Sequence, residues 1–219
     1  MRLPAALTAV VMTVLPAACE RRPEPPPVRA PATELPSAPA DGDGWRASIS
    51  PADASTLGRL GQAWRLARAE AEDAGFAPRV EAFGPLVDPN AGLAGNLQPA
   101  PGDYRCRVIG LGARTAGDPA HVETPWGRCT VELAPGGDLW LAVAEGPRRL
   151  RGRLHPESDR RLVFLGAEAA GDDADLPDYG EQPRRDRVGV FERIAPSRWR
   201  LVLPWPRQGA KLEILELVP

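Results

Sequence analysis

The sequence RVGVFERIAPSRWRLVL, residues 187–203, decides the fold class, because it has the pattern of two strands joined by a tight turn. Apolar residues dominate 187–194 and 198–203, and only a short link around Pro196 separates the two runs. Parallel neighbours would need a long crossover connection, for which this link leaves no room. The segment is therefore predicted to form two antiparallel, neighbouring strands.

The same pattern extends on both sides of this hairpin. A second tight link, Pro156-Glu157-Ser158-Asp159, also joins two apolar runs. The predicted strands cover 103–111, 126–133, 138–144, 148–155, 160–167, 187–194, 198–203 and 211–218. The sequence therefore predicts a mainly β fold: an antiparallel curled sheet or small barrel of about eight strands, with a two-sheet sandwich as the alternative.

One helix is predicted before the strands. Ser50 is a suitable N-cap, Pro51 suits the first helical turn, and Gly75 is placed to end the helix. Apolar residues recur between them at alternating spacings of three and four, at Leu57, Leu60, Trp64, Ala67, Ala71 and Ala74. This stripe is expected to pack on the sheet.

The N-terminal segment has the layout of a secretory signal. Arg2 supplies a positive start, and residues 3–15 are mostly apolar. About thirteen apolar residues fall short of the roughly twenty that a membrane-spanning helix needs. We therefore expect residues 1–18 to be a removable signal peptide and the protein to be exported to the periplasmic side of the cell envelope.

The residues Ala17-Ala18-Cys19 resemble the lipobox of bacterial lipoproteins, although that pattern prefers Leu where this chain has Pro16. The resemblance implies a diacylglycerol on Cys19, and hence a membrane as partner through a lipid anchor. Ordinary signal cleavage, with Cys19 free or paired, is the alternative. An Asp directly after the lipidated cysteine looks like an inner-membrane retention signal of some bacteria. This chain has Glu20 at that position, which favours the outer membrane.

Residues 19–44 are predicted to combine the lipidated cysteine with a tether. Residues 20–44 contain seven prolines and no aromatic residue, so they cannot build a hydrophobic core. In an extended polyproline conformation this segment would reach on the order of 75 Å, at about 3.1 Å per residue. A single globular domain is expected over 45–219.

The charge balance gives no sign of a nucleic-acid partner. The whole chain has 27 basic and 29 acidic residues, and removal of residues 1–18 takes away one base, Arg2. The exported chain would therefore have a net charge near −3, with no strongly basic segment. We expect no nucleic-acid binding.

The three cysteines suggest one crosslink. If Cys19 is lipidated, Cys106 and Cys129 remain, each within a predicted strand. A disulfide between them would close a loop of about 24 residues and stabilise the fold by about 3 kcal/mol on the chain-entropy model. The alternative is a metal site that uses both cysteines with His121 and His155, but the close paired spacings of zinc motifs are absent.

Several stretches, taken in their order along the chain, together resemble a known family. They are residues 102–108, 161–166, 185–194 and 198–206, followed by the Leu- and Glu-rich ending at Pro219. In combination they are similar to a family of uncharacterised bacterial envelope lipoproteins, domain of unknown function 4893. The likeness covers most of residues 45–219. It supports the expected fold and location and implies no reaction.

No catalytic motif is visible in the sequence. Neither His121 nor His155 has a recognisable nucleophile nearby, and the nucleophile elbow, metalloprotease helix, phosphate-binding loop and dinucleotide fingerprint are absent. We therefore predict no cofactor. The acidic run Asp172, Asp173, Asp175 and Asp178 lacks the spacing of a calcium-binding loop and is interpreted as a solvated loop.

One polar block is a candidate binding site. Tyr179, Asp186, Arg193 and Trp199 are predicted to line one rim of a pocket. The alternative, which we favour, is that Asp186 pairs with a neighbouring arginine while Trp199 fills the core beside Phe191.

Two function classes remain open from sequence. The first is a non-catalytic envelope module that binds a small apolar ligand or an envelope protein, for example at the mouth of a barrel. The second is a small periplasmic hydrolase, whose site would be a pair of carboxylates converging in a cleft. The missing catalytic motifs favour the first.

Overall fold

The computed structural model describes residues 44–134, 137–144, 148–170 and 176–219, all within one compact unit. The predicted signal peptide, Cys19 and the tether up to residue 43 lie outside the described residues. So do Asp172, Asp173 and Asp175 of the acidic run.

The predicted helix is present as a series of shorter helices. They are α1 (Gly44–Ser48), α2 (Pro51–Gly58), α3 (Leu60–Ala71), the π-helix η1 (Glu72–Phe76), α4 (Ala77–Ala82) and the 3-10 helix η2 (Gly84–Val87). The Ser50 side chain caps α2 by accepting the Asp53 N–H, as predicted.

The helical region is interrupted. The helix breaks at Arg59, whose φ of −96° and ψ of 13° are not helical, and Gly58 and Gly61 flank the break. Glycine is the weakest helix former after proline, so the chain bends there at little cost. Gly75, at a φ of 91°, changes the direction of the chain but does not end the helical region, because α4 follows.

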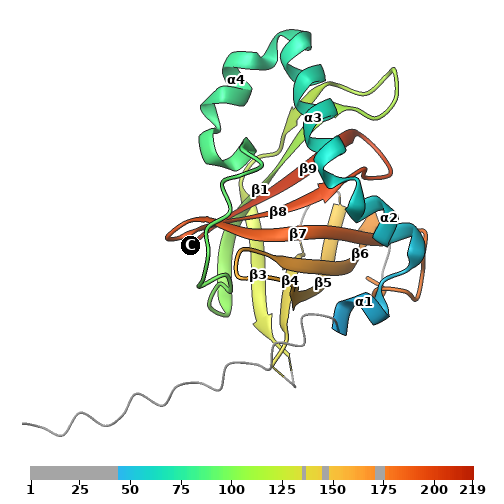
Figure 1. Cartoon of the computed structure of the whole chain (residues 1–219), viewed down its shortest axis with the longest axis vertical. Helices are drawn as coiled ribbons and strands as arrows, with labels where there is room; N and C mark the ends of the chain where they lie inside the picture. The colour runs from blue at the N-terminus through green and yellow to red at the C-terminus, as the bar shows by residue number, and fades with distance from the viewer. Residues whose placement is uncertain (1–43, 135–136, 145–147, 171–175) are drawn as a thin grey trace, which may run out of the picture. The chain divides into compact units, whose positions relative to one another are not determined.

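Within the described residues, nine strands follow the helices. They are β1 (Gly102–Ala113), β2 (His121–Glu123), β3 (Gly127–Leu133), β4 (Leu139–Val143), β5 (Arg148–Pro156), β6 (Leu162–Ala170), β7 (Asp186–Ala195), β8 (Arg198–Pro204) and β9 (Ala210–Val218). All eight predicted strands are present (Figure 1). The additional strand, β2, is only three residues long, too short to produce a recognisable alternating pattern.

Eight of the strands form a closed antiparallel barrel. Each pairs with the next along the chain in the order β1-β3-β4-β5-β6-β7-β8-β9, and β9 pairs back with β1 to close the sheet. The short strand β2 pairs only with β1. The barrel prediction is thus confirmed and the sandwich alternative is wrong.

Side chains fill the interior of the barrel. Inward positions alternate along each strand, as expected from the period of two, and supply one apolar cluster. Gly152 and Gly166 face each other across β5 and β6, and a Cβ on either would lie 2.5 Å from the ring of Phe164. The absence of two side chains therefore makes room for one aromatic ring in the middle of the barrel.

The two ends of the barrel are closed differently. At one end Trp199 donates its indole N–H to the Leu97 carbonyl at 3.0 Å and meets the Tyr104 ring edge-on. At the other end two ion pairs, Arg187 with Glu168 and Arg148 with Glu213, lie over the apolar core. Little free volume remains inside, about 50 Å³ at the charged end.

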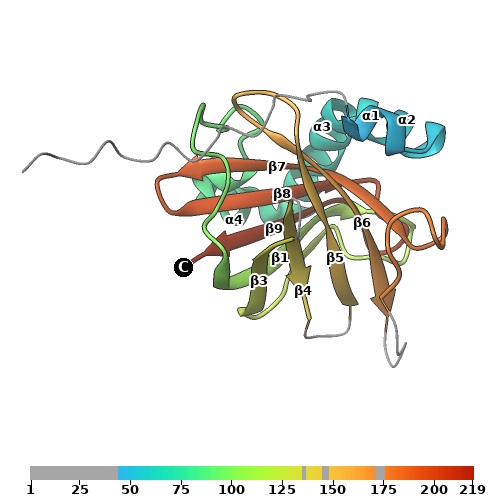
Figure 2. The ribbon, with the colours of Figure 1, turned by 90° about the horizontal axis from the view of Figure 1, so that it is seen from below.

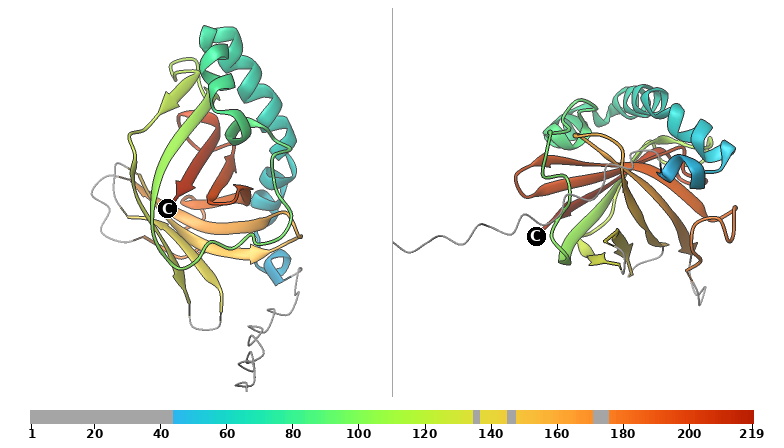
Figure 3. Two further views of the ribbon diagram at one scale, coloured as in Figure 1. Left: turned by 90° about the vertical axis from the view of Figure 1, so that its left-hand side faces the viewer. Right: turned by 60° about the horizontal axis from the view of Figure 1, so that its bottom comes forward.

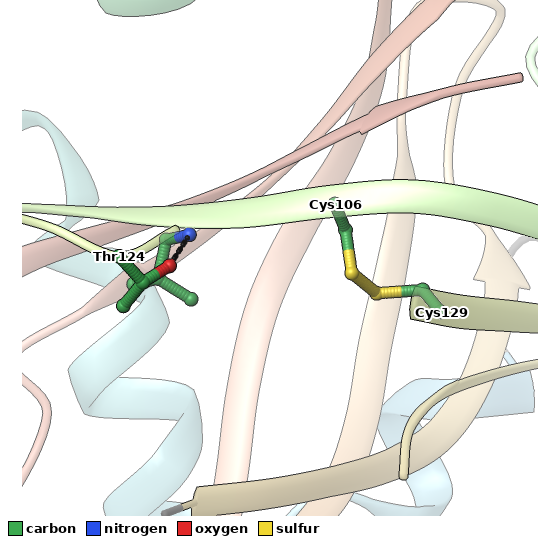
Figure 4. Close-up of a disulfide and its surroundings, with 4 residues drawn as sticks. Cys106, Thr124 and Cys129 are labelled. Carbon is green, nitrogen blue, oxygen red and sulfur yellow. Dashed lines mark hydrogen bonds between the residues drawn. A yellow bond between two sulfur atoms is a disulfide. The ribbon is translucent and has the colours of Figure 1, made fainter. Parts of the chain in front are cut away.

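The predicted disulfide joins Cys106 of β1 to Cys129 of β3, inside the barrel (Figure 4). The two Cα atoms are 5.9 Å apart, within the usual range of about 4.4 to 6.8 Å. Nearby, the Thr124 hydroxyl accepts the N–H of Val108 at 2.8 Å, which fixes the chain just before β3. Both sulfurs are occupied, so the alternative of a metal site with two cysteine ligands is excluded.

The helices cover one side of the barrel. Figures 2 and 3 show α1, α2 and α3 on the outside of the sheet, with β3, β4 and β5 on the opposite side. Ala63, Trp64, Ala67 and Ala71 of α3 are buried against outward-facing residues of β1, β8 and β9, so the helix packs on the sheet as predicted.

Candidate functional site

The helices do not pack tightly along the whole sheet, and a cleft of about 470 Å³ remains between α1 to α3 and the outer face of β7 and β8. Val190 of β7 and Val202 of β8 form its floor. The other lining residues are Trp45, Ala54, Leu57, Gly58, Leu60, Gly61, Trp64, Pro89, Glu157, Arg161 and Glu192. The volume is within the range of small-molecule sites.

The side of the cleft formed by the helices is open because two of the residues that line it are glycines. An added Cβ on Gly58 would meet no atom within 4 Å, and one on Gly61 would meet only the end of the Arg65 side chain. The helix backbone therefore faces open space at this point. The break at Arg59 lies between the two glycines and belongs to the same opening.

Two carboxylates line the cleft, and each is held by an arginine. Glu157, in the turn between β5 and β6, is ion-paired with Arg161 and lies 3.9 Å from Arg46. Glu192, on the outer face of β7, accepts a hydrogen bond of 2.8 Å from Nε of Arg200. Both side chains are largely buried, 12% and 14% exposed.

Arg200 is fully buried and joins three parts of the molecule. Its Nη1 lies within hydrogen-bond distance of the backbone carbonyls of Pro85, Leu86 and Asp88, and its guanidinium stacks on the Trp64 ring at 5.2 Å. A buried charge is tolerated only when it is paired and hydrogen-bonded, and both conditions are met. Arg200 thereby fixes Glu192 and the segment after α4 beside the cleft.

Trp45 closes the opposite end of the cleft. Its side chain is only 6% exposed and packs against Val163, Leu165 and Val188 on the outer face of β6 and β7. Its indole Nε1 is buried and has no hydrogen-bond partner among the described residues. Buried indole N–H groups usually find an acceptor, so this donor is unsatisfied in the described part of the structure.

Neither histidine lines this cleft. His121 of β2 stacks on the rings of Phe76 and Phe83, and its Nε2 is 3.5 Å from Oε1 of Glu123. His155 of β5 lies in a separate hollow beside Trp140 and Tyr179. Burial lowers the pKa of both imidazoles, which favours their neutral forms.

The four residues predicted to line one pocket rim form two separate pairs. Tyr179 donates to Asp53 at 2.7 Å and accepts from the Ser50 N–H, while Asp186 accepts the Gly180 N–H. Burial raises the pKa of Tyr179 to about 12, so its hydroxyl stays protonated. Burial also raises the pKa of Asp186. This pair anchors the start of α2 to the start of β7.

The second pair lies at the far end of β7. Arg193 faces Trp199 across β7 and β8 and donates to the carbonyls of Ala94 and Gly95. Trp199 belongs to the same core cluster as Phe191, as the favoured alternative predicted. Asp186 and Arg193 are separated by seven residues of β7, roughly 23 Å at about 3.3 Å per residue. The four side chains therefore do not form one rim.

The described part of the chain contains neither a candidate metal site nor a helix that could span a membrane. It contains no group of three or more His, Cys, Asp or Glu side chains placed to hold a metal ion. None of the helices within it has the length and apolar character that crossing a bilayer requires.

Comparison with known families gives one match. The model of a domain of unknown function, DUF4893, matches residues 45–217, which covers the helices, the cleft and the complete barrel. The chain belongs to the DUF4893 family. No curated protein and no solved structure matches it. The resemblance stated above is confirmed for the domain, and the family model attaches no activity to it.

Sequence reasoning missed this cleft. Glu157 was noted only as part of a turn, Trp64 only as part of the helical stripe, and Glu192 and Arg200 only as parts of strands. The available signal was two glycines, Gly58 and Gly61, within an otherwise helical pattern, since glycine there costs stability and needs a reason. The second signal was the pair of opposite charges Glu192 and Arg200 within two neighbouring strands that are rich in apolar residues.

Proposed function

We propose that this DUF4893 protein is a lipid-anchored envelope module that binds a small, mainly apolar ligand in the cleft between α1 to α3 and the outer face of β7 and β8. The single observation that carries this proposal is the cleft itself: about 470 Å³ over an apolar floor, with a few polar groups at its ends. The interior of the barrel is filled, so the ligand is assigned to the outside of the barrel.

The polar groups indicate what the ligand must offer. The Trp45 indole N–H needs a hydrogen-bond acceptor. Glu157 and Glu192 already accept from arginines, so a second cation is not required to neutralise them. An apolar body with one acceptor, such as a carbonyl or hydroxyl oxygen, fits this arrangement.

The test is to identify what the protein carries when it is purified from its own envelope. Mass spectrometry of the native protein should detect a small organic molecule, and Gly58→Leu should lose it, because Gly58 lines the cleft and a Cβ there meets no atom within 4 Å, which leaves room for a side chain that takes up ligand space. Gly117→Leu is the matched control, since that glycine also faces open space but lies in a turn away from the cleft. Equal ligand content in both variants would exclude the cleft.

A carboxylate-based hydrolase is the second candidate, because Glu157 and Glu192 line the same cleft. Hydrolysis by two carboxylates needs one of them to carry a proton for the leaving group. Here each carboxylate is ion-paired with an arginine, which suits a structural role better than a role as a proton donor. Hydrolysis of model esters or glycosides that disappears in both Glu157→Gln and Glu192→Gln, with the fold intact, would favour the enzyme.

The lipid anchor is part of the same proposal and rests on the sequence Ala17-Ala18-Cys19. Cys19→Ser should move the protein from the membrane fraction to the soluble fraction without unfolding it, because a proline-rich segment separates this residue from the domain. Glu20 after the cysteine favours the outer membrane as its location. Unchanged partition of the variant, together with an unmodified N-terminus in the parent, would reject the anchor.

A further inference from the structure

The floor of the cleft under the helices changes from apolar to polar along β7 and β8. Val190 and Val202 lie directly opposite each other in the pairing of the two strands, and Glu192 and Arg200 form the next pair on the same face. Side chains two residues apart on a strand point to the same side of a sheet. A molecule that lies on the two valines therefore has Glu192 beside one of its ends.

The Glu192 carboxylate uses only one of its two oxygens to bind Arg200. Nε of Arg200 donates to Oε2 at 2.8 Å, and Nη2 lies 2.6 Å from the same oxygen. Within the part of the chain that the structure describes, Oε1 accepts no hydrogen bond, and it is not sealed off from solvent. A carboxylate oxygen accepts hydrogen bonds and has no proton to donate. Oε1 is therefore an unused acceptor on a residue that lines the cleft.

Gly92, in the loop that follows η2, leaves space beside this oxygen. A Cβ at residue 92 would lie 3.2 Å from Oε1 and 3.4 Å from the carboxyl carbon of Glu192. The loop is held at this point, because Nη1 of Arg160 donates to the Gly92 carbonyl at 3.3 Å. The next N–H, of Leu93, donates to the Arg193 carbonyl at 2.8 Å. The space beside Oε1 thus lies between a fixed loop and a fixed carboxylate.

The charged groups that line the cleft are already paired. Arg161 neutralises Glu157, and Arg46 lies 3.9 Å from the same carboxylate. Arg200 neutralises Glu192. An ionised ligand would bring in a charge for which no counterion is left, and burying an unpaired charge is costly. A hydroxyl group avoids this cost, because it donates a hydrogen bond without carrying a charge.

We propose that the cleft binds a neutral alcohol, whose hydroxyl group donates to Oε1 of Glu192 while its apolar body lies on Val190 and Val202. This inference rests on the proposed function and names the chemical class of its ligand. A hydrogen bond to an ionised acceptor is stronger than one between neutral groups. An ether has the same oxygen without the donor, so it would cover Oε1 and leave it unpaired, which costs binding free energy.

Two isomeric probes test the hydroxyl group alone. Octanol and methyl heptyl ether consist of the same atoms and have similar apolar areas, but only the alcohol has a hydrogen-bond donor. Calorimetric titration of the purified protein should show that octanol binds about tenfold more tightly, because the ether leaves a charged acceptor without a partner. Octylammonium should bind no more tightly than octanol, since Arg200 already neutralises Glu192.

Gly92→Ala tests whether Oε1 is the acceptor. The added methyl group covers Oε1 without removing the ion pair of Glu192 with Arg200. The affinity for octanol should therefore fall to about that for the ether, and the affinity for the ether should hardly change. Gly117→Ala is the matched control, because an added Cβ there meets no atom within 4 Å and the residue does not line the cleft. It should bind both probes as the parent does.

Glu192→Gln gives a second test that does not depend on the loop. Its amide keeps an oxygen for Arg200 and replaces Oε1 by an NH₂ group, which donates instead of accepting. Both probes can accept from this group, so the preference for octanol over the ether should shrink.

The outcomes separate this inference from the proposed function. Equal binding of octanol and the ether, tighter binding of octylammonium than of octanol, or an equal loss of both probes in Gly92→Ala would show that the ligand is not selected as an alcohol. Gly58→Leu should weaken the binding of both probes. If neither probe binds the parent, or if both bind Gly58→Leu as they bind the parent, the cleft is not a binding site and the proposed function fails as well.

Discussion

The inner and outer faces of β7 and β8 differ in how completely they are packed. On the inner face, Phe191, Leu201 and Leu203 meet side chains from the other strands of a closed barrel, and almost no space is left. On the outer face, Val190 and Val202 lie beneath the bent helices, and a cleft remains. Inside the barrel, the strands of one closed sheet face one another, so their side chains fill the space between them. On the outside, a broken helix covers the sheet incompletely.

The polar residues of the two faces differ in the same way. Near the charged end of the interior, Arg187 and Glu168 close a filled core. On the outer face, Arg200 and Glu192 hold a loop in place beside an open space. The structure of the outer face therefore depends on individual hydrogen bonds. The structure of the inner face depends on how closely its side chains fit together. The experiments below break each face in its own way.

Arg200→Met should have the largest effect on stability. It leaves the largely buried Glu192 without its cation and the carbonyls of Pro85, Leu86 and Asp88 without this donor. Breaking a buried pair from one side typically costs about 3 to 5 kcal/mol of unfolding free energy. Urea unfolding measures the loss.

The exposed substitution Arg65→Met is the control for Arg200→Met and should have almost no effect. In the double variant Arg200→Met/Glu192→Leu, removal of the unpaired charge should recover part of the stability. Unchanged stability of Arg200→Met alone would show that the outer face does not depend on this pair.

Cys106→Ser tests the inner face through its crosslink. The disulfide joins two strands and spans a sequence separation of 23, and its loss should lower the free energy of unfolding by about 3 kcal/mol on the chain-entropy model. The reduced parent protein is the matched comparison, because it loses the same bond without a change of sequence. If reduction leaves the urea midpoint unchanged, the packing of the barrel interior alone determines its stability.

Gly152→Ala tests the shape of the inner face directly. The new Cβ would lie 2.5 Å from the Cα of Gly166 and from the Phe164 ring, so backbone and ring must move apart. Overpacking of this kind costs about 1 to 3 kcal/mol. Combining it with Phe164→Leu should reduce the additional cost if the ring is the obstacle, which a double-mutant cycle measures. Strict additivity of the two changes would contradict the proposed role of the glycine pair.

The inner face was predictable from sequence, for a physical reason. Strand side chains alternate with a period of two, so apolar runs, tight links such as Pro196-Ser197 and the two strand cysteines gave the barrel and its crosslink. The closure of β9 on β1 joins distant parts of the chain, and no local pattern distinguishes it from an open curled sheet.

The outer face was less predictable because it depends on tertiary contacts. The helical stripe correctly indicated packing on the sheet, but not the break at Arg59 or the cleft that follows from it. Arg200 contacts residues more than a hundred positions away, and charged residues in a strand are normally interpreted as exposed. The candidate rim around Tyr179 and Trp199 failed because neighbours in sequence lie at opposite ends of β7.

The two histidines should make stability depend on pH. Burial lowers the pKa of His121 and His155, so the unfolded chain binds these protons more readily than the folded protein. Their contribution is fully present above the ordinary pKa of about 6.5 and is lost as the pH falls below it. Urea unfolding as a function of pH should show this loss, and His121→Phe/His155→Phe should reduce it. An unchanged pH profile in that variant would assign the dependence to other groups.

The smallest effect on stability is expected for Gly58→Ala, and it should have the opposite sign to Gly152→Ala. Both changes add one methyl group to a glycine, but at Gly58 this methyl meets no atom within 4 Å. Alanine is the better helix former, so the free energy of unfolding should rise by about 0.5 to 1 kcal/mol. Gly58 lines the cleft, so the added methyl should lower ligand affinity slightly, and Gly58→Leu should lower it further. If Gly58→Ala lowers stability, or if Gly58→Leu binds the native ligand as the parent does, the cleft is only imperfect packing between a bent helix and a barrel.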